Sequence, residues 1–116
     1  MDKVKKFLSD LVVHTKYANY SIKDERRQTW EECVDVLMHM HIKKYPELEE
    51  KIRSVFTEYV YTKKVLPSMR SVQFGGIPIE FAPNRIFNCA YTPIDNEFVF
   101  AEIMFLLLGG TGVGFS

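Results

Sequence analysis

The sequence predicts an α/β protein in two parts. Residues 1–65 are expected to form an amino-terminal helical region, because apolar side chains recur there at helical spacing. Residues 66–116 are expected to begin a sheet or barrel of the α/β class. In this part a stretch punctuated by proline and glycine leads into a strand-like run, an apolar helix and the start of a second strand. A hydrophobic content of 47% supplies side chains for a core and argues against disorder.

The helical region is expected to contain three helices. The first covers about residues 3–14, with apolar side chains at Val4, Phe7, Leu8 and Leu11. The second is expected to begin at Ser21, an N-cap with Asp24 three positions later, and to run to about Lys44. Its apolar stripe consists of Trp30, Cys33, Val34, Leu37 and His41. The third begins at Pro46, a residue suited to a first turn, and its stripe consists of Leu48, Ile52, Val55, Phe56 and Tyr59.

The second part is expected to start with a loop region. From Leu66 onward, prolines and glycines exclude one long helix and predict loop with short extended pieces. Residues 86–91 are rich in aromatic and branched side chains and predict a strand, after which Asp95 is expected to cap a fourth helix. That helix is expected to bury Phe98, Ala101, Met104, Phe105 and Leu108. A further strand is expected to begin at Val113, and strand amides need a neighbour, so the simplest account is a chain interrupted inside a βα unit.

Charge and composition narrow the classes of function. Fifteen basic and fifteen acidic residues give a formal net charge of zero, which disfavours a nonspecific nucleic-acid binder and a membrane-surface protein. The charged start lacks the apolar stretch of a signal peptide, and the longest apolar run, 103–108, is far shorter than the roughly 18 residues of a membrane span. Two cysteines do not make a disulfide framework, so the expected compartment is the reducing cytoplasm.

The two cysteines differ in their surroundings. Cys33 lies on the apolar stripe of the second helix and is expected to be a small core residue. Cys89 lies within the predicted strand, and the pattern leaves two possibilities open, a buried core cysteine or a reactive thiol. No metal site is expected, because His39 and His41 face different directions on their helix.

A glycine-rich run follows the fourth helix, with glycines at 110, 112 and 114. A dinucleotide-binding turn needs a strand before it, and a phosphate loop needs a lysine, so neither is predicted. Two possibilities remain: a helix stop with a flexible turn, or backbone that another group approaches closely. Ser68 also has two interpretations, an ordinary turn residue or a hydroxyl presented to an anion.

In their order along the chain, these segments resemble the catalytic subunit of ribonucleotide reductases. The matching segments are ERRQTWEE at 25–32, LPSMR at 66–70, FNCAYTPID at 87–95 and GGTGVGFS at 109–116. The last two, with an apolar helix between them, are the most specific. The resemblance is strongest to the adenosylcobalamin-dependent branch, of the ribonucleoside-triphosphate reductase type. It covers most of this chain, which would form only the front part of the family's subunit.

The resemblance implies a fold and a set of site residues. The fold would be a ten-stranded α/β barrel, with this chain supplying the amino-terminal helices and the first strand–helix unit. Cys89 matches the first cysteine of the redox-active pair, which reduces the ribose 2′ position after a thiyl radical elsewhere has taken the 3′ hydrogen. The matching substrate-binding positions are Ser68 for the phosphate, Asn88 for the ribose, and Gly110, Gly112 and Gly114 for a strand start against the active site.

The resemblance also implies what this chain would lack. The radical cysteine, the second reducing cysteine, the catalytic carboxylate and most of the adenosylcobalamin-binding surface would lie beyond Ser116, so the chain is expected to be inactive alone. The implied partners are a ribonucleotide, the remaining carboxy-terminal part and a thioredoxin-like reductant. One alternative is a non-catalytic helical interaction module derived from the same amino terminus. Another keeps the reaction but takes the radical from a metal-bearing partner subunit.

Overall fold

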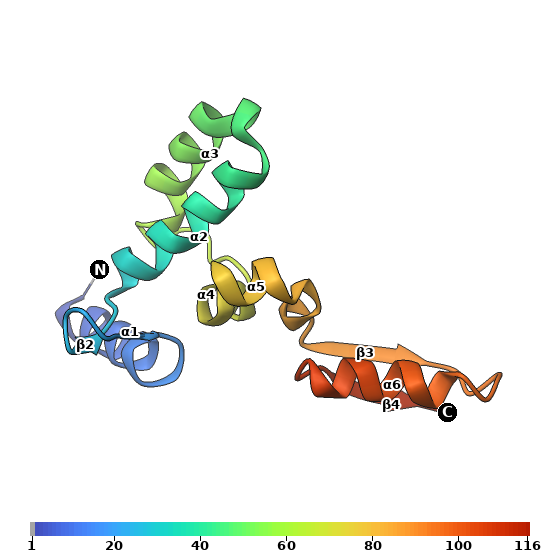
Figure 1. Cartoon of the computed structure of the whole chain (residues 1–116). Helices are drawn as coiled ribbons and strands as arrows, with labels where there is room; N and C mark the ends of the chain where they lie inside the picture. The colour runs from blue at the N-terminus through green and yellow to red at the C-terminus, as the bar shows by residue number, and fades with distance from the viewer. Residues whose placement is uncertain (1) are drawn as a thin grey trace.

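The helical region is organised around one central helix. The computed structural model describes residues 2–116, and its first helices are α1 (Lys3–Lys16), α2 (Trp30–Lys44) and α3 (Glu49–Val55). A 3-10 turn, η1 (Pro46–Leu48), precedes α3, and a π-helical turn, η2 (Phe56–Val60), follows it. α2 contacts both other helices (Figure 1). The core consists of Val13, Ala18, Trp30, Cys33, Val34, Leu37, Val60 and Val72. The predicted stripe of α2 is therefore confirmed for Trp30, Cys33, Val34 and Leu37, whereas His41 is half-buried and lies outside this cluster.

The predicted start of the second helix at Ser21 is wrong. α2 begins after Thr29, whose hydroxyl accepts the Glu32 N–H at 3.3 Å while the Glu32 carboxylate accepts the Thr29 N–H at 2.7 Å. The Ser21 hydroxyl instead donates to the Asp24 carboxylate at 2.7 Å and stabilises a turn. This turn joins two short antiparallel strands, β1 (Tyr20–Ser21) and β2 (Arg26–Arg27). Ser21 with Asp24 and Thr29 with Glu32 both have the spacing of a capping box. The Ser21 hydroxyl bonds within its own turn, and such local hydrogen bonds compete with helix formation.

The helix predicted after Pro46 is confirmed, but its stripe is buried only in part. Ile52 and Phe56 are half-buried, whereas Leu48, Val55 and Tyr59 are exposed. The cause is that α3 packs mainly along α2, which covers a narrow strip of its surface.

The loop predicted after Leu66 is largely helical. It contains α4 (Met69–Phe74), α5 (Ile77–Phe81) and a 3-10 turn, η3 (Pro83–Ile86). Pro78 and Pro83 occupy first-turn positions, where the missing N–H has no helical partner to lose. Gly76, at φ +85°, turns the chain between α4 and α5. The prolines and glycines thus separate short helices rather than marking extended loop.

The chain ends in a strand–helix–strand unit, residues 89–115. Its elements are β3 (Cys89–Thr92), α6 (Val99–Leu108) and β4 (Gly112–Phe115). β3 and β4 pair in parallel, with Cys89 opposite Gly112 and Thr92 opposite Phe115. Both predicted strands are therefore present, although β3 is shorter than residues 86–91. The strand expected to need a neighbour finds one in β3. The fold is mixed α/β, mostly helical, with two small sheets.

The predicted cap and buried face of the last helix are wrong. α6 begins after Phe98, and the Asp95 carboxylate accepts a hydrogen bond from its neighbour Asn96 instead of capping the helix. The buried residues of α6 are Val99 and Ile103. The five predicted ones are exposed: Phe98, Ala101, Met104, Phe105 and Leu108. Every residue of α6 except Glu102 is apolar, so periodicity does not select a buried face, and a two-stranded sheet covers only a narrow strip of the helix.

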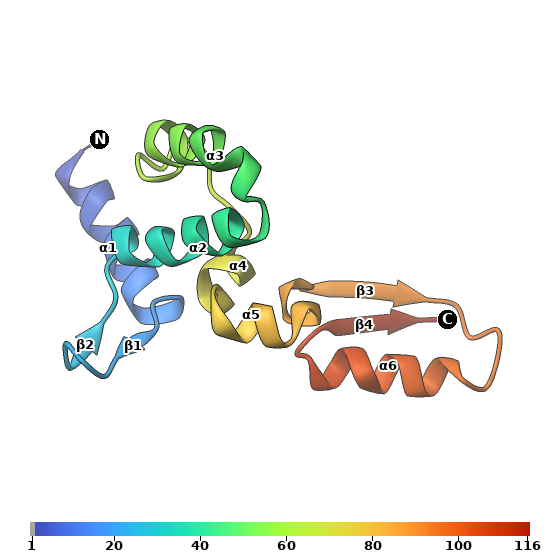
Figure 2. The same ribbon diagram turned by 45° about the horizontal axis from the view of Figure 1, so that its top comes forward.

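The strand–helix–strand unit projects from the helical region (Figures 1 and 2), with α4, α5 and η3 between them. The radius of gyration is 17.0 Å. A compact domain of this length would have about 13 Å. Residues 2–116 include no helix with the length and apolar character needed to cross a bilayer.

Candidate functional site

The candidate site lies on the exposed face of the β3–β4 pair. Side chains alternate along β3: Cys89 and Tyr91 are exposed, whereas Ala90 and Thr92 are half-buried. Cys89 is a free thiol, so of the two possibilities left open by the sequence, the buried core cysteine is excluded. Its partner across the pair is Gly112, so the thiol has bare backbone beside it.

The structure gives different reasons for glycine at the three predicted positions 110, 112 and 114. Gly110 has φ +87°, a conformation that other residues rarely adopt. A Cβ on Gly112 would meet only the Asn88 carbonyl oxygen at 3.7 Å, and one on Gly114 only Tyr91 Cδ2 at 3.7 Å. Both are ordinary contacts, so packing within residues 2–116 does not require glycine at either position. They belong to a paired strand rather than to a flexible turn, which favours close approach of another group.

Arg70 joins the separate segments of the site. It lies in the first turn of α4, two positions after Ser68, and its Nη2 donates to the Gly110 carbonyl at 2.6 Å. Its Nε donates to Asn88 Oδ1 at 3.4 Å, and its guanidinium lies 5.5 Å from the Phe74 ring centroid. The structure therefore brings the segment of Ser68 next to Asn88 and the glycine turn. Ser68 itself is exposed, and its hydroxyl does not cap α4.

Two hydrogen bonds, from Thr111 and from Gly112 at the start of β4, fix the start of the strand pair. Thr111 is 2% exposed, and its hydroxyl donates to the Phe87 carbonyl at 3.3 Å. The Gly112 N–H donates to the Asn88 carbonyl at 2.9 Å. The sequence interpretation missed both Arg70 and Thr111. Arg70 was visible in the LPSMR segment, but its partners are 18 and 40 positions away.

The charge of Arg70 is not neutralised by an acid. Its partners are a carbonyl, a carboxamide and an aromatic ring, and the ion pairs within residues 2–116 do not include it. The site therefore offers a cation, a thiol and bare backbone. An exposed thiol can exchange with another thiol or with a disulfide. By contrast, burial raises the pKa of the Cys33 thiol and keeps that group unreactive.

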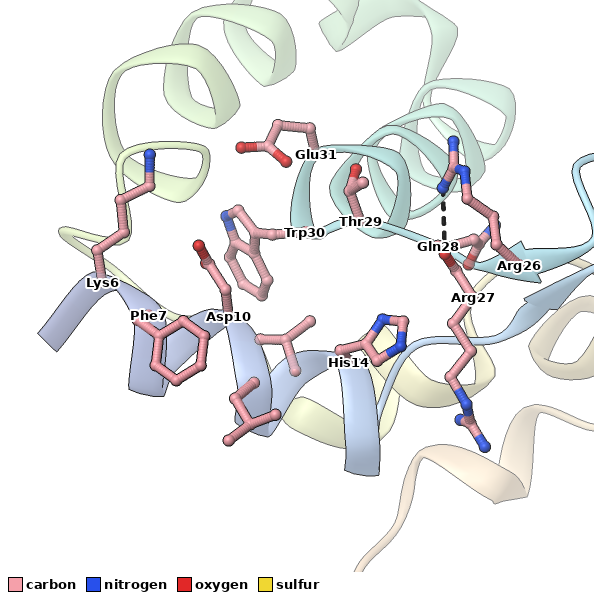
Figure 3. Close-up of a pocket in the computed structure, with 12 residues that line it drawn as sticks. Lys6, Phe7, Asp10, His14, Arg26, Arg27, Gln28, Thr29, Trp30 and Glu31 are labelled. Atoms are coloured by element: carbon pink, nitrogen blue, oxygen red, sulfur yellow. Dashed lines mark hydrogen bonds between the residues drawn. The ribbon is translucent and has the colours of Figure 1, made fainter. Parts of the chain in front are cut away.

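A cavity near the amino terminus is a different feature. It has a volume of about 560 Å³ and lies between α1 and the start of α2, where Phe7, Asp10, His14 and Trp30 line it (Figure 3). Asp10 is engaged with Lys63 at 2.8 Å. None of the predicted site residues lines this cavity. Within the described residues, no three side chains of His, Cys, Asp or Glu gather closely enough to hold a metal ion.

Comparison of the chain with protein families, with curated proteins and with solved structures finds no match.

Proposed function

We propose that the chain is the amino-terminal part of a ribonucleotide reductase catalytic subunit, of the adenosylcobalamin-dependent, ribonucleoside-triphosphate reductase type. The observation that carries the proposal is the exposed Cys89 thiol, held on a paired strand opposite Gly112 and next to Asn88. These are residues that the family resemblance assigns to the reducing cysteine and to substrate contacts. A reducing thiol needs a fixed support, and in this proposal the pair β3–β4 supplies it once further strands complete the sheet.

In this proposal Cys89 is one of two thiols that reduce the ribose. The C2′–O bond breaks, the oxygen leaves as water, and a C2′–H bond forms. Two cysteine thiols supply the two electrons and two hydrogens and end as a disulfide, with the second cysteine supplied by the rest of the subunit. A thioredoxin-like dithiol then reduces that disulfide by exchange, and the exposure of Cys89 gives it access.

The remaining site residues have binding roles in the proposal. Asn88 contacts the ribose, and Ser68 contacts the phosphate. The bare backbone at Gly112 and Gly114 lets the nucleotide lie close to the strand, since packing in this chain leaves those positions open.

Further strands are part of the proposal, because β3 and β4 form only a two-stranded parallel sheet. Parallel sheets are normally covered on both faces, and the outer face of α6 exposes Phe100, Met104, Phe105 and Leu108. A barrel completed by another segment would pair the open edges and cover these side chains.

Adenosylcobalamin, the proposed radical source, is assigned to that other segment. The cavities beside α1, α2 and α5 are lined by residues other than Cys89. Activity of the assembled enzyme that depends on added adenosylcobalamin would support this source, whereas dependence on a metal-bearing partner subunit would replace it.

The decisive test is Cys89→Ser in the assembled reductase. Multiple turnover with a thioredoxin-like donor should be abolished, because the redox-active disulfide cannot form. Cys33→Ala is the matched control and should retain turnover, since Cys33 is a core residue. Multiple turnover by Cys89→Ser with that donor would refute the role of the thiol.

A non-catalytic interaction module remains the second candidate. One observation favours it: α1 exposes Val4, Phe7, Leu8, Leu11 and Val12 and buries only Val13. Such a face is suited to binding another protein. A neighbouring reading frame for the remaining barrel would support the reductase, and absence of that frame would support the module.

A further inference from the structure

We propose that Arg70 is a positioning residue of the reductase site, which fixes the Asn88 carboxamide so that its N–H donors are free for the substrate ribose. The inference rests on the proposed function above. Arg70 would join the proposed site residues and act on the ribose through Asn88.

The orientation of Asn88 follows from the chemistry of its partner. An arginine side chain has only donors, so the atom of Asn88 that faces Arg70 Nε at 3.4 Å must be the carboxamide oxygen. The amide nitrogen then points away from Arg70. Within residues 2–116 it has no acceptor, which leaves both of its N–H groups available to a bound hydroxyl.

Two contacts other than Asn88 fix the Arg70 guanidinium. Its Nη2 donates to the Gly110 carbonyl at 2.6 Å, and its guanidinium lies near the Phe74 ring. Gly110 supplies that carbonyl from a backbone with φ +87°, and a Cβ there would lie 3.4 Å from Arg70 Nη1. The glycine turn therefore provides both an acceptor and the space for the guanidinium.

The contact lies next to the proposed chemistry. The carbonyl of Asn88 accepts the Gly112 N–H at 2.9 Å, and the next residue, Cys89, is paired with Gly112. Rotation of the Asn88 side chain would therefore change what the ribose meets beside the reducing thiol. A lysine at position 70 could bond one of the two acceptors but lacks the planar fork that reaches both.

The experiment uses the assembled reductase that contains this chain. Arg70→Ala should lower kcat/KM for the ribonucleotide by about 10- to 100-fold, the range of a lost charge-assisted hydrogen bond. Added guanidinium ion should restore part of this loss. Arg85→Ala is the matched control, because Arg85 lies 5.9 Å from the same Phe74 ring, and it should change kcat/KM by less than about twofold.

A double-mutant cycle separates positioning from a merely structural role. In the Asn88→Ala background, Arg70→Ala should have less than about a twofold further effect, because its target is already absent. Arg70→Lys covers the case in which Arg70→Ala does not fold, and it should lose activity to an intermediate degree. Additive effects in the cycle, or wild-type activity in Arg70→Lys, would overturn the inference. If the wild-type enzyme reduces ribonucleotides and Arg70→Ala has the same kcat/KM, only the role of Arg70 is overturned. If the wild-type enzyme does not reduce ribonucleotides, the proposed function is overturned as well.

Discussion

The helical region and the strand–helix–strand unit differ in how much of themselves they bury. The helical region supplies most of the main core cluster, and Val34 and Leu37 within it are fully buried. The unit of β3, α6 and β4 buries only Val99, Ile103 and Thr111. The helical region therefore has a core of its own, whereas the unit depends on little more than one strip of α6.

This contrast bears on function, because the proposed chemistry lies in the less buried part. Cys89 and the glycines of β4 belong to a unit with open sheet edges and an uncovered helix, and Asn88 directly precedes that unit. A two-stranded sheet is marginal by itself, and a further layer would stabilise it. The residues of the proposed site therefore lie where the protein needs further strands and helices to cover its open edges and apolar side chains.

The largest expected effect compares two buried apolar residues, one in each region. Leu37→Ala should destabilise the helical region by about 2–5 kcal/mol, the cost of a cavity in a packed core. Ile103→Ala, at a similarly buried position, should leave the unfolding of that region within about 0.5 kcal/mol of wild type. Urea unfolding followed by the fluorescence of Trp30, the single tryptophan and a core residue, measures both. Equal shifts from the two variants would show that the regions unfold as one unit.

The two cysteines give the second comparison. Iodoacetamide should modify Cys89 in the native chain and modify Cys33 at least about 100-fold more slowly, since Cys33 must wait for an opening of the core. The raised pKa of the Cys33 thiol adds to this difference, because the thiolate is the reacting form. Mass spectrometry of the digested protein measures each rate, and both thiols should react alike in urea. Comparable native rates would mean that the core around Cys33 is not closed.

The sequence predicted those features that depend on neighbours in the chain. The apolar stripe around Val34 and Leu37, the start of a helix at Pro46 and the two strands of the last unit follow from local spacing. The true start of α2 could not be predicted, because Ser21 and Thr29 have the same capping spacing. Which of them caps the helix depends on the pairing of β1 with β2.

The candidate site was predictable in its residues but not in its connections. The sequence indicated Cys89, Asn88 and the glycine run, and the structure places Cys89 opposite Gly112. Arg70 was missed because a guanidinium that bridges segments 18 and 40 positions away leaves no periodic pattern. The buried face of α6 was missed for a related reason: nine of its ten residues are apolar, so the sequence does not show which side packs against the sheet.

A smaller effect tests which residue caps α2. Thr29→Ala should destabilise the helical region by about 1 kcal/mol, because the hydroxyl that accepts the Glu32 N–H is lost. Ser21→Ala is the matched control and should have less effect on the same Trp30 transition, since Ser21 bonds only within its turn. A larger loss from Ser21→Ala would favour a helix that starts earlier than Thr29.

The smallest expected effect is a pH dependence confined to the helical region. Donation by the Arg26 guanidinium, and then by the Thr29 N–H, lowers the pKa of Glu32 to about 2. A group whose pKa is lowered on folding stabilises the folded state above its unfolded pKa, here 4.5, and this contribution is lost as the pH falls toward 2. Glu32→Gln keeps a side chain suited to the capping box but removes this titration, so the Trp30 transition should depend less on pH between 4.5 and 2.

Glu31→Gln removes a carboxylate from the adjacent position, which has no ion pair with Arg26, and is the control for net charge. Equal changes in both variants would indicate that overall charge, rather than the Arg26–Glu32 pair, sets the acid sensitivity. Hydrogen exchange of the β3 and β4 amides should not follow this titration, because Glu32 lies in the helical region. Coupled behaviour would mean that the capped end of α2 also supports the unit that carries Cys89, and the contrast between the two regions would then be one of burial but not of stability.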